Sequence, residues 1–104
     1  MSTKNIAGKT IEVNEEGYLL NMADWTKEIA LELAKEINLP PLTDKHWQVI
    51  DYLRKNQAEG VALSLRKVGN SGIVDVKELY ALFPGGPLKK SALVAGIPKP
   101  ASCV

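Results

Sequence analysis

The sequence predicts a mostly α-helical (α+β) protein, a small helical domain with an N-terminal β-hairpin and a flexible C-terminal arm. Three observations predict this class. Apolar residues recur at helical spacing through 24–95, and within 10–20 apolar and polar residues alternate in short stretches flanked by turn residues. Proline recurs after residue 96. A chain of 104 residues suits one domain with one modest core. We therefore expect a domain over 1–96 and an arm over 97–104 that contributes little to the core.

The composition bounds the class of protein. Apolar residues make up 45% of the chain and charged residues 24%, which is ordinary for a globular domain. No apolar run has membrane-spanning length, and the first residues lack the apolar stretch of a signal peptide. We expect a cytoplasmic protein, in which a lone cysteine stays a reactive thiol because it has no internal disulfide partner.

The N-terminal stretch predicts a hairpin of short strands. Ile11 and Val13 alternate with polar residues over 10–14, and turn residues occur at 7–9 and at 14–17, before a second short strand at 18–20.

Two longer helices follow. Residues 24–37 form the first, because apolar side chains recur there every four residues, and Asn38 and the prolines after it end the helix; the repeat comprises Trp25, Ile29, Leu33 and Ile37. The second begins after Thr43 as N-cap, with Leu42 and Trp47 at hydrophobic-staple spacing, and runs toward Gly60. Both tryptophans are expected in the core, because each lies at helical spacing with aliphatic residues.

Three shorter helices complete the domain. The first covers 61–68 and ends at the glycine-rich stretch 69–72. The second starts at the capping pair Asp75 and Glu78 and runs to residue 83, before a proline. The third covers 87–95, because proline opens it and glycine follows it.

The segment after Gly96 predicts an arm that carries the thiol. Pro98 and Pro100 fix two φ angles and remove two backbone donors. An extended chain rises about 3 Å per residue, so the residues after Gly96 would span about 25 Å. Cys103 lies near the end, and Lys99 is the charged residue closest to it. Such a thiol can enter another protein's pocket.

Charge is divided unevenly along the chain. Residues 44–104 hold nine Lys or Arg against five Asp or Glu, which favours a thiolate at Cys103 and attracts anionic partners. An ordinary solvated surface explains the same excess equally well. Direct nucleic-acid binding is not expected, because nucleic-acid binders are usually much more basic. A DNA-binding regulator using helices within 43–83 remains a lesser alternative, with a basic face limited to Arg66 and Lys67.

His46 is the single histidine, and no metal site is expected around it. A structural role in the first turn of its helix is favoured over catalysis, because no nucleophile lies near it in the sequence.

Several motifs together resemble one family. They are the run from Leu79 to Pro87, the run from Ala95 to Pro100, Cys103 next to the end, and three upstream stretches, 14–19, 24–25 and 42–47. In this order they resemble the DsrC/TusE family of sulfur-carrier proteins, and the likeness covers nearly the whole chain.

The resemblance implies a function for the arm. In that family the penultimate cysteine carries sulfur as a persulfide, accepted from one protein and presented to another without a cofactor. For this chain the resemblance implies that Cys103 is the reactive residue. The residues that shape its arm are then Gly96, Pro98, Lys99 and Pro100. The implied partners are a sulfur donor of the TusBCD or DsrEFH type and, as acceptor, a tRNA thiouridylase or a sulfite reductase. Such a carrier is of the sulfurtransferase type, with no self-contained active site.

Two departures from the family pattern bear on the partner. Members that work with dissimilatory sulfite reductase have a second cysteine eleven residues before the last one, and here that position is Ala92. The stretch 60–79 is also shortened. The single-cysteine pattern is similar to the TusE branch, which implies sulfur relay toward 2-thiouridine in tRNA. The alternative within the family is a DsrC-like gamma subunit or partner of dissimilatory sulfite reductase, in sulfur oxidation or reduction.

Overall fold

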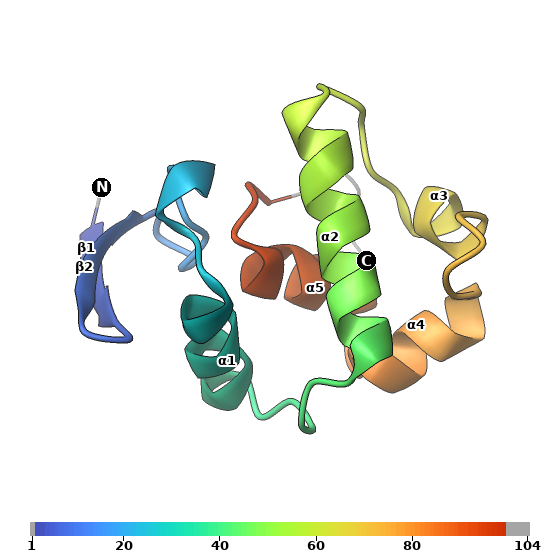
Figure 1. The fold of residues 1–104 in the computed structure, drawn as a ribbon, viewed down its shortest axis with the longest axis horizontal. Coiled ribbons are helices and arrows are strands. Elements are labelled where there is room, and N and C mark those ends of the chain that lie inside the picture. The colour runs from blue at the N-terminus through green and yellow to red at the C-terminus, as the bar shows by residue number, and fades with distance from the viewer. Residues whose placement is uncertain (1, 100–104) are drawn as a thin grey trace.

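The fold is arranged around its last helix, α5. The computed structural model describes residues 2–99, to which all structural statements here refer. Figure 1 shows the hairpin at one end of the molecule, α3 and α4 at the other, and α5 between α1 and α2. The elements in chain order are β1 (Ser2–Ile6), β2 (Lys9–Val13), the 3-10 helix η1 (Met22–Asp24), α1 (Lys27–Glu36), α2 (Asp44–Ala58), α3 (Leu65–Gly69), α4 (Val76–Leu82) and α5 (Pro87–Ala95). The mostly helical α+β class is confirmed.

The hairpin is present, but its strands differ from those expected. β2 pairs antiparallel with β1, from Ser2 opposite Val13 to Ile6 opposite Lys9. Ala7 and Gly8 both have positive φ (52° and 79°), which is the backbone of a tight two-residue hairpin turn. Residues 18–20 make only an isolated bridge, between Leu19 and Val13. The first strand was not predicted, because its sequence lacks alternation of apolar and polar residues: only the last residue of the strand is apolar and buried.

The first helix begins three residues later than expected, because two caps follow one another. The Asn21 side chain accepts from the Ala23 N–H and caps η1. Thr26 is extended, and its Oγ1 accepts from the Ile29 N–H at 3.2 Å, which starts α1. Trp25 therefore lies in the extended link between η1 and α1, outside the helix in which it was expected.

The other helix ends follow the sequence signals more closely. Thr43 is the N-cap of α2, and Asp75 and Glu78 form the capping box of α4. Proline at the first position and glycine after the last bracket α5 as expected. α3 is shorter than the helix expected over 61–68, because Ser64 caps its start by accepting from the Lys67 N–H at 3.0 Å.

His46 has the structural role expected of it. Its side chain is 2% exposed and its ring meets Phe83 edge-on at 5.1 Å between centroids. Its Nδ1 accepts from the Thr43 N–H at 2.9 Å, so Nε2 carries the proton and donates to the Leu82 carbonyl at 2.9 Å. The histidine thereby joins the start of α2 to the end of α4.

The core extends two residues beyond α5, through Gly96 to Ile97. Leu88, Ala92 and Ile97 are fully buried, and α5 packs against α1, α2 and α4. The Ile97 N–H also donates to the Ala92 carbonyl at 3.2 Å. The expectation that residues after Gly96 add little to the core is therefore corrected at Ile97: the position of α5 in the molecule, which local sequence does not reveal, buries this side chain.

Candidate functional site at the arm root

We call residues 94–99 the arm root. They comprise the last two residues of α5 and the four residues that lead from it toward the cysteine. Among the predicted site residues, Gly96, Pro98 and Lys99 lie in this segment; Pro100 and Cys103 lie outside the described residues. Gly96 is buried, whereas Pro98 and Lys99 are exposed. The chain passes from the interior to the surface within these residues.

Gly96 meets two demands that other residues do not. Its φ of 70° is left-handed, which glycine adopts without strain. A Cβ placed on it would lie 2.4 Å from Cδ1 of Trp25, far inside van der Waals contact. The indole thus packs directly against the backbone at the start of the arm root.

Trp25 and Arg54 hold the end of α5 by hydrogen bonds. The Trp25 Nε1–H donates to the Val94 carbonyl at 2.8 Å, and Nη1 of Arg54 donates to the Ala95 carbonyl at 2.9 Å. The second guanidinium nitrogen of Arg54 donates to the Met22 carbonyl at 3.1 Å. Its Cζ lies 4.3 Å from the centroid of the Trp25 ring, a cation–π contact.

Burial acts on the charge of Arg54. It lowers the pKa of the guanidinium from its ordinary value, and the carboxylate of Asp51 opposes that shift. No signal in the sequence marks Arg54, because it lies on α2, far along the chain from the Ala95 carbonyl that it binds. One signal was available for Trp25, since a buried indole N–H needs an acceptor.

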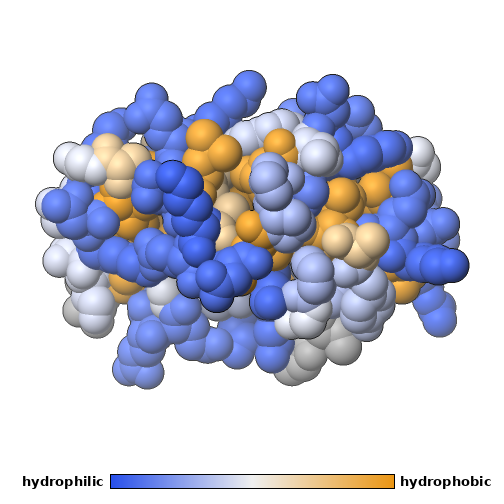
Figure 2. All heavy atoms as spheres, turned by 90° about the horizontal axis from the view of Figure 1, so that it is seen from below, coloured by the Kyte–Doolittle hydropathy of each residue, from blue (hydrophilic) through white to orange (hydrophobic). Residues whose placement is uncertain are grey.

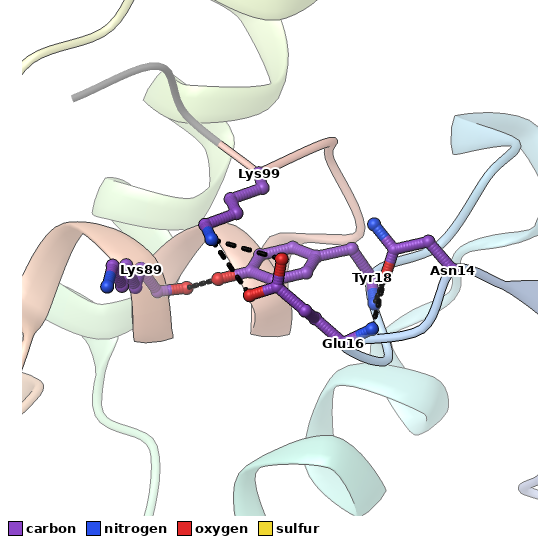
Figure 3. A network of polar contacts seen from close by, with 5 residues as sticks. All are labelled: Asn14, Glu16, Tyr18, Lys89 and Lys99. Atoms are coloured by element: carbon purple, nitrogen blue, oxygen red, sulfur yellow. Dashed lines mark hydrogen bonds and ion pairs between the residues drawn. The ribbon is translucent and has the colours of Figure 1, made fainter. Parts of the chain in front are cut away.

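Lys99 contacts the turn that follows the hairpin. Its Nζ lies 3.0 and 2.9 Å from the two carboxylate oxygens of Glu16, beside the Tyr18 ring (Figure 3). The Asn14 side chain shapes this turn by accepting from the N–H groups of Glu16 and Tyr18. The Tyr18 hydroxyl donates to the Lys89 carbonyl of α5 at 3.3 Å.

The polar cluster shifts the titration of its tyrosine. Burial is the largest cause that raises the pKa of Tyr18, the Glu16 carboxylate raises it further, and Lys99 lowers it. From the sequence, Lys99 was expected to shape the arm. In the structure its ammonium pairs with the Glu16 carboxylate, and through this contact the arm root touches the N-terminal part of the chain.

Other surface features lie away from the arm root. A hollow of about 380 Å³ is lined by residues of α1 and of the 39–42 stretch, and a second of about 320 Å³ lies between α2 and Ile73. Of the exposed large apolar side chains, Val76 and Tyr80 lie one turn apart on α4, while Leu20 and Leu31 lie on other segments. Figure 2 shows apolar areas divided by polar ones. Within residues 2–99, no cluster of His, Cys, Asp and Glu could hold a metal.

The order of motifs along this fold corresponds to a known family. Residues 5–104 match the family model described as DsrC like protein. The chain belongs to the DsrC-like family. The resemblance drawn from the sequence motifs is confirmed, and the match includes both the arm root and Cys103 of this DsrC-like protein.

Named relatives fall into two groups. The protein is 36% identical to the sulfurtransferase TusE of Photorhabdus laumondii, with 93% of this chain and 94% of the relative aligned. It is 33% identical to the dissimilatory-type sulfite reductase gamma subunit of Nitratidesulfovibrio vulgaris, over the full length of both. The solution structure of DsrC from Allochromatium vinosum superposes with a TM-score of 0.82 at 39% identity, covering 98% of this chain and 97% of that one.

In the described part of this DsrC-like protein, no helix has the length and apolarity needed to cross a membrane.

Proposed function

We propose that this DsrC-like protein is a cytoplasmic single-cysteine sulfur carrier, loaded on Cys103 and unloaded by a partner protein. The observation that carries the proposal is that the family match runs through the only cysteine of the chain. Relatives in that match are named sulfurtransferase or sulfite reductase gamma subunit. In this proposal Gly96, Pro98, Lys99 and Pro100 shape the arm that presents the thiol.

The chemistry needs one nucleophile and no cofactor. The Cys103 thiolate attacks the outer sulfur of a donor persulfide, the donor's S–S bond breaks, and its electron pair leaves on the donor thiolate. A new S–S bond forms on Cys103, so one sulfur atom moves and the reaction has no net oxidation. Unloading repeats the step, with the Cys103 persulfide as donor and a thiolate of the acceptor as nucleophile.

The route favoured is relay toward 2-thiouridine in tRNA, with a TusBCD-like donor and a tRNA thiouridylase as acceptor. Its support is the likeness to TusE together with Ala92, whose side chain is fully buried in α5. A chain with one cysteine cannot close an internal disulfide, so in this proposal a thiol of the acceptor, and not a second cysteine of this chain, takes up the sulfur.

A second candidate is a gamma-type partner of dissimilatory sulfite reductase, supplied by a DsrEFH-like donor. The full-length match to the gamma subunit of Nitratidesulfovibrio vulgaris favours it. Affinity capture with purified TusBCD, thiouridylase and sulfite reductase separates the two routes, because each predicts binding to a different acceptor.

The loading step is tested by mass spectrometry of the intact protein. Incubation with a persulfide-loaded TusBCD-type donor should add one sulfur, about 32 Da, which a reductant removes. Peptide mapping should place the sulfur on Cys103, and Cys103→Ser should take up none. Loading of the serine variant, or no loading of the wild type by this donor or by a small-molecule persulfide, would overturn the proposal.

A further inference from the structure

We propose that Trp25 and Arg54 are positioning residues that fix the direction in which the chain leaves the domain, and so determine where Cys103 is presented. The inference rests on the sulfur-carrier function. It assigns a transfer-related role to two side chains that lie in the domain and not on the arm.

The last turn of α5 presents four backbone carbonyls, of residues 92–95. The last four carbonyls of a helix lack intrahelical donors. Here the Ala92 and Leu93 carbonyls accept from the N–H groups of Ile97 and Gly96, both at 3.2 Å. The remaining two, of residues 94 and 95, accept from Trp25 and Arg54. Local backbone thus satisfies half of the helix end, and two side chains from elsewhere in the chain satisfy the other half.

Trp25 and Arg54 together form a clamp on the end of α5. Arg54 joins three segments, because it extends from α2 to the carbonyls of Met22 and Ala95 while stacking on Trp25. The planar guanidinium of arginine has several N–H donors in fixed directions, so it can donate to both carbonyls and stack on the indole at the same time. The single ammonium of a lysine cannot donate to both carbonyls and stack as well. The arrangement therefore depends on geometry and not on positive charge alone.

The chain leaves the domain after Ile97, and the contacts before and after this residue differ in strength. Ile97 is fully buried, so the chain is held up to this residue by the clamp and by the core. The next contact, between Lys99 and Glu16, joins side chains that are 35% and 55% exposed, and exposed ion pairs hold weakly. Within residues 2–99, the buried contacts of the clamp and of Ile97 therefore hold the chain more firmly than the exposed Lys99–Glu16 pair does.

The consequence for transfer is geometric. From Ile97 to Cys103 the chain advances six residues, which limits the reach to about 20 Å in an extended chain. A partner bound to the domain meets the thiol only where the exit direction and this reach place it, and misplacement of reacting atoms by about 1 Å can cost up to about a hundredfold in rate. A loosened clamp therefore slows transfer between proteins without altering the thiol itself.

The direct test measures where Cys103 lies relative to the domain. Lys77→Cys on the exposed face of α4 supplies a second site, and nitroxide labels on both cysteines give a distance distribution. Arg54→Met and Arg54→Lys should each broaden or shift that distribution, and Arg66→Met on α3, a matched change away from the arm root, should not. Trp25→Phe, which keeps a ring but removes the N–H, should act in the same direction.

The rate of sulfur transfer is measured as well, in variants that lack the Lys77→Cys change and so have Cys103 as their single cysteine. Arg54→Met and Arg54→Lys should accept sulfur from a small-molecule persulfide within about twofold of the wild-type rate, yet about tenfold more slowly from the TusBCD-type donor. If loading of the variants were slowed equally with the small-molecule persulfide and with the protein donor, the reactivity of the thiol itself would have changed. That result, or unchanged distances and transfer in folded Arg54 variants, overturns the positioning role. Failure of the wild type to load sulfur would instead overturn the carrier function, while the distance measurement would still test the clamp.

Discussion

Truncation at two neighbouring positions should separate the domain from the arm. Deleting 99–104 removes Lys99 and its contact with Glu16, an exposed ion pair worth at most about 1 kcal/mol. Deleting 97–104 removes Ile97 as well. We expect the first truncation to leave the free energy of unfolding nearly unchanged and the second to lower it strongly.

The magnitude follows from the burial of one side chain. Ile97 is fully buried, and emptying such a site costs about 2–5 kcal/mol. Loss of the hydrogen bond from its N–H to the Ala92 carbonyl adds about 1 kcal/mol. A loss of about 4 kcal/mol is a large part of the stability of a small domain, and at about 4–8 °C per kcal/mol it lowers the melting temperature by more than about 15 °C.

The assay is urea and thermal unfolding followed by circular dichroism. Ile97→Val and Ile97→Ala in the full chain serve as graded controls, with expected losses of about 1 and about 3 kcal/mol. They separate burial of the side chain from shortening of the chain. Agreement of the two truncations within about 0.5 kcal/mol would refute the reasoning, because it would mean that Ile97 contributes nothing to the core.

Three further predictions concern stability, pH and binding. Gly96→Ala should lower the free energy of unfolding by about 2 kcal/mol or more in urea titrations, because its Cβ would meet Trp25 and its φ is left-handed. Since the pKa of Tyr18 is raised in the folded protein, its stabilising effect is complete below the ordinary tyrosine pKa and is lost as pH rises through the folded value; Tyr18→Phe should therefore show less alkaline loss of stability above about pH 10. Binding to duplex DNA, measured by fluorescence anisotropy, should be weak and steeply salt-dependent, and Arg66→Ala with Lys67→Ala should reduce it at all sequences alike. Tight, sequence-specific binding at physiological salt would favour the regulator alternative.

The parts of the fold that the sequence predicted are those with local causes. Thr43, Asp75 and the bracket of Pro87 and Gly96 each determine a helix end through contacts within a few residues, and each end lies where expected. Trp25 was assigned to a helix because its spacing fits one. Competing local caps, at Asn21 and Thr26, exclude it from that helix.

The parts that escaped prediction have distant causes. Ile97 follows a helix-ending glycine and precedes a proline, so its neighbours indicate an exposed arm, yet the position of α5 buries it. Arg54 is one of several cations on α2, and its role depends on a carbonyl 41 residues further along the chain. The family motifs pointed to Gly96, while the side chains that surround it required the three-dimensional structure.

The central position of α5 has a consequence for how the protein is made. A ribosome synthesises α1, α2 and α4 before α5, although all three pack against it. Until α5 and Ile97 have been added, the apolar faces of α1, α2 and α4 that pack against α5 are uncovered, and the nascent chain stays exposed to chaperones and proteases. Premature termination before Ile97 should therefore leave an unstable chain that is degraded, and not a folded carrier that lacks only its thiol.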